Sequence, residues 1–144
     1  RVIYPCHMNP TVRGLAEEMF AGNEHVRLID PLEVTDFHNM IKKSYLVLTD
    51  SGGIQEEGPS LGKPVLVVRE TTERPEGVEA GTLKLVGTST ENIFREVSRL
   101  LDDEEAYGQM SRAENPYGDG HASERIVGAI LRYFQNKETQ RIPA

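Results

Sequence analysis

Short apolar runs alternate with longer amphipathic segments along most of the chain. Each run is about five residues long and rich in β-branched residues, which is typical of buried strands. We place strands at 1–5, 26–30, 45–49, 64–68 and 83–87. The runs "YLVLT" and "PVLVV" have no polar alternation, as expected of parallel strands whose two faces are both covered.

The intervening segments carry apolar residues three and four positions apart, the spacing of a helix face that packs on a core. Asn9 and Pro10 suit the start of the first helix, and Gly22 suits its end. Gly58 and Pro59 are expected to interrupt the third helix. The predicted helices are 9–22, 33–44, 53–62, 90–101, 102–113 and 122–134.

This order of elements predicts an α/β fold with a parallel sheet, right-handed crossovers and helices on both faces. Residues 1–135 are assigned to one domain, and 136–144 to a polar tail that has lost the helical period. Ligands of such sheets bind beyond the carboxyl ends of the strands. Those ends are therefore where functional residues are expected.

Composition narrows the class of protein. The 144 residues carry a net charge of −7, which disfavours nucleic acid or an anionic membrane surface as partner. The single cysteine, Cys6, rules out an intrachain disulfide, and we expect a buried thiol in a cytoplasmic protein. The sequence has no apolar stretch near the roughly 18–20 residues of a membrane span. It begins with Arg1 in an apparent strand, which suggests a piece of a longer protein.

The segment "DSGGIQEEG" (50–58) follows the strand at 45–49 and opens a helix. Free amides at a helix N-terminus, and glycines that let a ligand approach the backbone, suit a phosphate. A carboxylate one turn later, at Glu57, suits the hydroxyls of a ribose. The alternative is an ordinary cap, in which the Ser51 hydroxyl bonds to the helix amides.

A second polar segment, "RETTERPE" (69–76), follows the next strand and should lie at the same edge of the sheet. Its two arginines, Arg69 and Arg74, match phosphate oxygens in geometry. The alternative is that these arginines pair with glutamates of their own loop.

The block "LTDSGGIQEEGPSLGKPVLVVRETTERPEGVEAGTLKLVGT" (48–88) closely resembles the non-hydrolysing bacterial UDP-N-acetylglucosamine 2-epimerases. "YPCHMNP" (4–10) and "NPYGDGHASERI" (115–126) are similar to the same family, in the same order. The resemblance implies a Rossmann-like, doubly wound domain, the C-terminal half of a two-domain enzyme of the GT-B type. It also implies a missing N-terminal domain and, for the intact protein, a homodimer.

By this resemblance, the reaction interconverts UDP-GlcNAc and UDP-ManNAc through elimination and readdition of UDP, and it uses no metal and no cofactor. The implied UDP ligands are Ser51, Gly52 and Gly53 for the diphosphate, Glu57 for the ribose and Phe37 for the uracil. Arg74 is implied on the phosphate or sugar side, as an assisting catalytic residue. His7 is implied at an allosteric UDP-GlcNAc site.

The same resemblance places the main acid and base groups outside this chain, which is therefore expected to be inactive alone. Three other readings remain. The chain could be a stand-alone nucleotide-sugar-binding or regulatory module, the donor domain of a GT-B glycosyltransferase, or part of a hydrolysing epimerase. The long block at 48–88 disfavours the glycosyltransferase.

Overall fold

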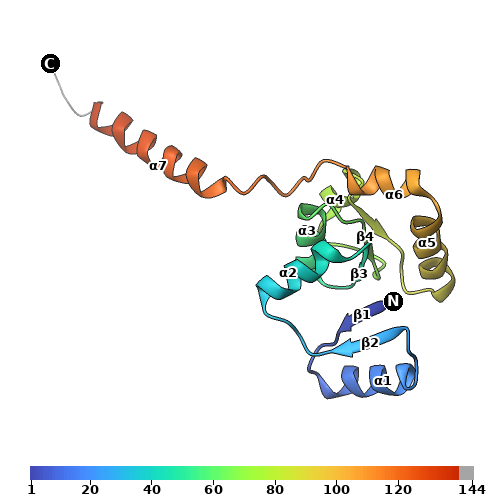
Figure 1. Cartoon of the computed structure of the whole chain (residues 1–144). Coiled ribbons are helices and arrows are strands. Elements are labelled where there is room, and N and C mark those ends of the chain that lie inside the picture. Colours follow the sequence, from blue (N-terminus) through green and yellow to red (C-terminus); the bar gives the residue numbers. More distant parts are fainter. Residues whose placement is uncertain (140–144) are drawn as a thin grey trace. The chain divides into compact units, whose positions relative to one another are not determined.

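The structure, a computed structural model, describes residues 1–139 and confirms the α/β class, with helices between parallel strands (Figure 1). The chain divides into two compact units, Arg1–Lys43 and the part from Ser44 onward. Each unit is described by itself.

The first unit holds a parallel strand pair, β1 (Val2–Pro5) and β2 (Val26–Ile29), with α1 (Pro10–Phe20) between them in the chain. The helix α2 (Val34–Lys43) follows. The predicted start of α1 is confirmed, because the Asn9 side chain accepts a hydrogen bond of 2.9 Å from the Thr11 N–H. Cys6, directly after β1, is buried as expected.

The second unit is built on three parallel strands in the order β3-β4-β5. Sequence order and spatial order agree, so each crossover joins neighbouring strands. The strands are β3 (Val47–Thr49), β4 (Val65–Val67) and β5 (Leu83–Leu85). The helices are α3 (Gly52–Ser60), α4 (Pro75–Glu79), α5 (Thr90–Asp102), α6 (Glu104–Ser111) and α7 (Ala122–Thr139).

The central strand β4 is buried on both faces, as its uninterrupted apolar sequence predicts. Leu66 points to one face, where it packs with Val86 and with Leu100 and Ala106 of α5 and α6. Its neighbours on β4 point to the opposite face and pack with Leu83 and Tyr117. Two apolar layers therefore hold β4 in place. Its carboxyl end in turn fixes the start of the loop at 68–74.

Three expectations need correction. The five predicted strands pair as two parallel sheets, β1-β2 and β3-β4-β5, where we expected one sheet. The helix α3 is not interrupted at Gly58 and Pro59, because Pro59 lies in its last turn, where few hydrogen bonds remain to be lost. The tail expected from residue 136 is helical as far as Thr139, and the rest of it lies outside the described residues.

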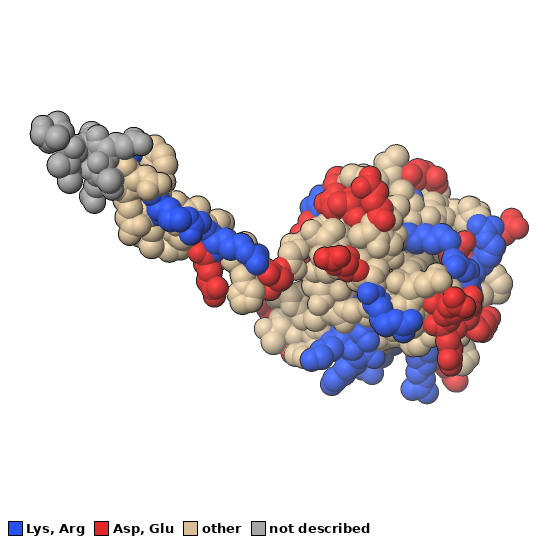
Figure 2. Space-filling view, turned by 90° about the horizontal axis from the view of Figure 1, so that it is seen from above, with Lys and Arg blue, Asp and Glu red and all other residues tan. Residues whose placement is uncertain are grey.

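Within residues 1–139, no helix is both long and apolar enough to span a membrane. On the face seen in Figure 2, acidic and basic side chains are interspersed over the surface.

Candidate functional site

Within the described chain, the turn between β3 and α3 gives the first amides of the helix no side-chain cap from Ser51. Ser51 is the N-cap residue with extended backbone, φ −80° and ψ 132°. In the described part of the chain its hydroxyl makes no capping hydrogen bond, so the capping alternative is not observed. The Ser51 N–H instead donates to Thr49 Oγ1 at 3.1 Å, which tightens the turn.

Gly52 and Gly53 open α3, and neither belongs to the glycines with positive φ. Neither glycine is therefore required here for an unusual backbone dihedral. Their contribution is the absence of a side chain. A Cβ built on Gly53 would lie 3.7 Å from Glu57 Oε1, so the predicted ribose carboxylate stands beside the predicted diphosphate turn. The sequence spacing between Gly53 and Glu57, about one helical turn, predicted this proximity.

A Cβ on Gly52 would lie 2.5 Å from Glu73 Oε1. The bare backbone at Gly52 thus gives room to a carboxylate from the loop after β4. This carboxylate lies at the N-terminus of α3, where the macrodipole favours negative charge. A hydrogen bond from its own backbone, and then the ion pair with Arg69, lower the pKa of Glu73.

Both arginines of the loop are paired with glutamates. Arg69 donates to Glu73 at 2.7 Å, which is the pairing within the loop that we had left open. Arg74 donates from Nε to Glu56 Oε1 and from Nη1 to the Glu73 carbonyl, the latter at 3.2 Å. The Glu56 bond raises the pKa of Arg74. Each guanidinium is therefore held by a carboxylate, Arg69 by Glu73 of its own loop and Arg74 by Glu56 of α3.

Beneath the surface, Gln55 connects the turn after β3 with the loop after β4. Its side chain is fully buried, and Nε2 donates to the Ser51 carbonyl at 3.3 Å. Its Oε1 accepts from Thr72 Oγ1 at 2.5 Å, and Thr72 Oγ1 accepts in turn from the Arg74 N–H at 3.0 Å.

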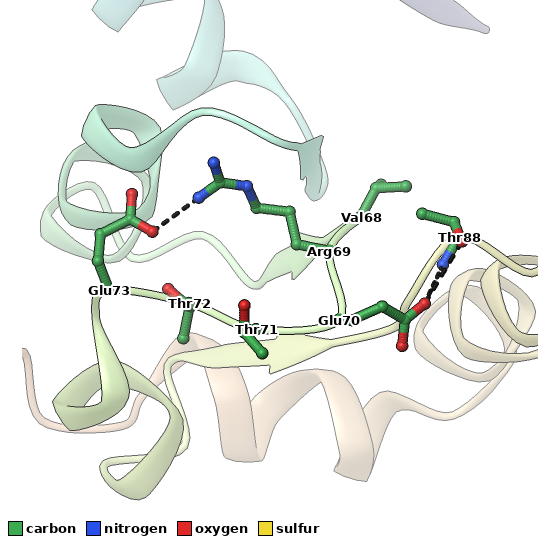
Figure 3. Close-up of a pocket in the computed structure, with 7 residues that line it drawn as sticks. All are labelled: Val68, Arg69, Glu70, Thr71, Thr72, Glu73 and Thr88. Atoms are coloured by element: carbon green, nitrogen blue, oxygen red, sulfur yellow. Dashed lines mark hydrogen bonds and ion pairs between the residues drawn. The ribbon is translucent and has the colours of Figure 1, made fainter.

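A pocket of about 530 Å³ adjoins the loop at the carboxyl ends of β4 and β5. Figure 3 shows Arg69 and Glu73 paired at one end and Glu70 bound to Thr88 at the other. Glu70 Oε1 accepts from the Thr88 N–H at 3.2 Å and from its hydroxyl at 3.3 Å, so it ties the loop to the end of β5. The pocket is lined by Val68, Arg69, Glu70, Thr71, Thr72, Glu73 and Thr88.

The two remaining predicted residues belong to the first unit. Phe37 is half-buried on α2. His7 is exposed, and its Nδ1 accepts from the Asn9 N–H at 3.1 Å, which fixes the loop before α1. The structure thus brings five of the predicted site residues together in the second unit: Ser51, Gly52, Gly53, Glu57 and Arg74. Phe37 and His7 belong to the first unit, which is described by itself.

Sequence reasoning missed Gln55 and Glu56 as residues of the site, and it gave Thr72 and Glu73 no individual role. Glu56 binds Arg74, a contact that helix periodicity does not indicate. One signal was available for Gln55, since a polar residue at a position that faces the core needs a buried partner. Among the described residues, no group of His, Cys, Asp and Glu has the arrangement of a metal site.

Comparison with known proteins identifies the family. Residues 1–131 match the family profile described as UDP-N-acetylglucosamine 2-epimerase. A Bacillus subtilis UDP-N-acetylglucosamine 2-epimerase is 59% identical over 140 residues, which are 97% of this chain and 37% of that protein. The chain thus spans a little over a third of the length of that relative.

Two solved structures have the same fold over most of this chain. Staphylococcus aureus MnaA, solved with UDP, is 59% identical with a TM-score of 0.87, over 92% of this chain and 36% of the other. The Neisseria meningitidis UDP-GlcNAc 2-epimerase, solved with UDP-GlcNAc, is 50% identical with a TM-score of 0.82, over 90% and 36%. By family profile, sequence identity and fold, this chain belongs to the UDP-N-acetylglucosamine 2-epimerase family.

Proposed function

We propose that this chain carries the UDP-binding site of a UDP-GlcNAc 2-epimerase, in a protein that interconverts UDP-GlcNAc and UDP-ManNAc. UDP leaves the sugar by elimination and adds back with the opposite configuration at C2. The net reaction is an isomerisation, so no redox cofactor is consumed. The Staphylococcus aureus and Neisseria meningitidis relatives, solved with UDP and with UDP-GlcNAc, support this choice of ligand.

One observation supports the proposal most strongly: the first turn of α3 has no side-chain cap within the described chain, and Glu57 stands beside it. In the proposed complex, the amides of Gly52 and Gly53 and the Ser51 hydroxyl donate to the diphosphate. Glu57, an acceptor of hydrogen bonds, receives the ribose hydroxyls. The Gly53 backbone and the Glu57 carboxylate stand one helical turn apart. This spacing suits a nucleoside diphosphate better than free phosphate.

Arg74 acts on the departing UDP in this proposal. The leaving diphosphate gains negative charge as the bond from the sugar to oxygen breaks, and a guanidinium near that charge lowers the barrier. Arg74 would exchange Glu56 for a phosphate oxygen. We assign Phe37 to the uracil and His7 to a second, regulatory UDP-GlcNAc.

Elimination also requires a base at C2 and an acid for the return step. We propose that these groups belong to the part of the relatives' length that this chain does not match. The chain alone is then inactive, and the two-domain protein works as a cytoplasmic homodimer that supplies a precursor of cell-envelope polysaccharide.

Calorimetric titration of UDP tests the nucleotide site. The unchanged chain should bind UDP saturably, and Glu57→Gln should weaken binding roughly tenfold through loss of the charged acceptor. Glu91→Gln, at the exposed start of α5, is the charge-matched control and should bind like the unchanged chain. Equal affinity of the Glu57 and Glu91 variants would remove Glu57 from the site.

A further inference from the structure

Gln55 is the most deeply buried polar residue close to the candidate site, with an exposed fraction of 0%. A buried amide needs partners for both its donor and its acceptor, because leaving either one unpaired costs stability. Gln55 has both partners, and they come from different segments: the turn after β3 and the loop after β4. The side chain therefore sets the position of one segment against the other.

The connection continues beyond Gln55. The Thr72 hydroxyl donates to Gln55 Oε1 and accepts the Arg74 N–H, so three hydrogen bonds run from the Ser51 carbonyl to the Arg74 backbone. We call this the Gln55 bridge. The Arg74 guanidinium is tied separately, to Glu56 on the same helix. A phosphate can draw the guanidinium away from Glu56, while the bridge keeps the backbone of Arg74 in place.

We propose that Gln55 is a positioning residue of the UDP site, which fixes the Arg74 segment against the Ser51–Gly53 turn through Thr72. The inference rests on the proposed function for its ligand. It assigns Gln55 and Thr72 no contact with UDP. Both act by holding two binding segments at one spacing, since small displacements of such groups are costly for binding and for catalysis.

The chemistry of the bridge explains why this position is a glutamine. The amide donates at one end and accepts at the other. An ionised glutamate of the same shape accepts only, so it faces the Ser51 carbonyl without a proton, and it adds a buried negative charge near the diphosphate. A leucine satisfies neither partner.

The test combines calorimetric titration of UDP with the thermal midpoint of three variants of the chain. Thr72→Val removes the hydroxyl at nearly constant shape, and we expect roughly tenfold weaker UDP binding. Thr72→Ser restores the hydroxyl and should bind within about twofold of the unchanged chain. Thr82→Val is the stability control, because the buried Thr82 hydroxyl donates to the Gly77 carbonyl at 3.1 Å, outside the bridge.

Thr82→Val should lower the thermal midpoint about as much as Thr72→Val and leave UDP affinity unchanged. An unchanged affinity in Thr72→Val, or an equal loss of affinity in both valine variants, overturns the proposal. Gln55→Glu supplies a pH signature. Its affinity relative to the unchanged chain should recover as pH falls, because a protonated carboxyl can donate to the Ser51 carbonyl.

Amide signals in a ¹⁵N correlation spectrum separate failure of the bridge from failure of the proposed function. If the unchanged chain binds no UDP, the proposed assignment of a UDP-binding site to this chain is wrong. The bridge is then judged without ligand: Thr72→Val must move the signals of Gly52 and Gly53 as well as that of Arg74. Movement of the Arg74 signal alone overturns it.

Discussion

The carboxylate of Glu73 occupies the space that a side chain on Gly52 would fill. Glu73 Oε1 lies 2.5 Å from the position of a Cβ built on Gly52. The first turn of α3, where we place the diphosphate of UDP, is therefore already faced by an anionic group of the protein. Arg69 holds that group through an ion pair of 2.7 Å.

Removal of the charge at Glu73 should strengthen nucleotide binding. A diphosphate at this turn has to displace the carboxylate or bind beside it, and like charges at close range repel. We expect Glu73→Gln to bind UDP roughly two- to fivefold more tightly in calorimetry at low salt, with a smaller gain at high salt. Weaker binding in this variant would mean that Glu73 supports the site.

Gly52→Ala should separate binding from stability. The new methyl meets only the far end of the Glu73 side chain, which can move, and alanine is favourable in a helix. We expect unfolding in urea to be unchanged within about 0.5 kcal/mol, or slightly stabilised. UDP binding should fall at least about tenfold, because the methyl blocks approach to the backbone. A variant that is equally stable and binds normally would contradict the assigned role of Gly52.

Gly77 is required by packing. It is buried at α4, where a Cβ would lie 2.5 Å from Leu83 Cδ1 in the apolar layer beneath β4. Gly77→Ala should destabilise the chain by about 1–3 kcal/mol in urea denaturation through overpacking. The control is Gly14→Ala in α1, where, beyond the adjoining residues and the backbone of the helix itself, no described atom lies within 4 Å of the added Cβ, and a small gain in stability is expected. Equal stability of the two variants would contradict this account of Gly77.

Glu96 should make stability depend on pH. Its carboxylate accepts from Lys84 at 2.5 Å, and this bond is the main reason that the pKa of Glu96 is lowered, against the effect of its burial. A carboxyl whose folded pKa is depressed stabilises the fold above its unfolded pKa of about 4.3. That contribution is lost as pH falls through the folded value.

We therefore expect Glu96→Gln to cost about 1–2 kcal/mol near pH 7 and much less near pH 3. Urea denaturation at both pH values checks this. The exposed Glu91→Gln variant should show no such change. A cost at Glu96 that is independent of pH would mean that shape, and not charge, matters there.

Much of the fold could be predicted from the sequence because its signals are local. The apolar run at 64–68 marked a strand buried on both faces, and Asn9 with Pro10 marked the start of α1. The pairing of the strands as two sheets was not predictable, because an apolar run indicates a strand but does not indicate which other strand it pairs with. The continuity of α3 was missed because a Pro59 in a last turn costs little, and position within the helix decides that cost.

The candidate site was predictable as far as its members are close in the sequence. Ser51 is the N-cap of α3, and Gly52, Gly53 and Glu57 lie in its first two turns, so their proximity follows from helical geometry. The contact of Gln55 with Thr72 spans 17 residues, and that of Arg74 with Glu56 spans 18. Such contacts depend on how β3 and β4 align, and the sequence pattern contains no information on that register.

Titration of UDP into the ¹⁵N-labelled chain, followed through its backbone amide signals, tests the central claim most directly. Our account predicts saturable movement of the Gly52 and Gly53 signals at the start of α3, and loss of that movement in Gly52→Ala. Phosphate alone should move the same signals only at much higher concentration, because it lacks the ribose that Glu57 receives. Saturable UDP binding that leaves these two amides unmoved would contradict the claim that the α3 turn holds the diphosphate.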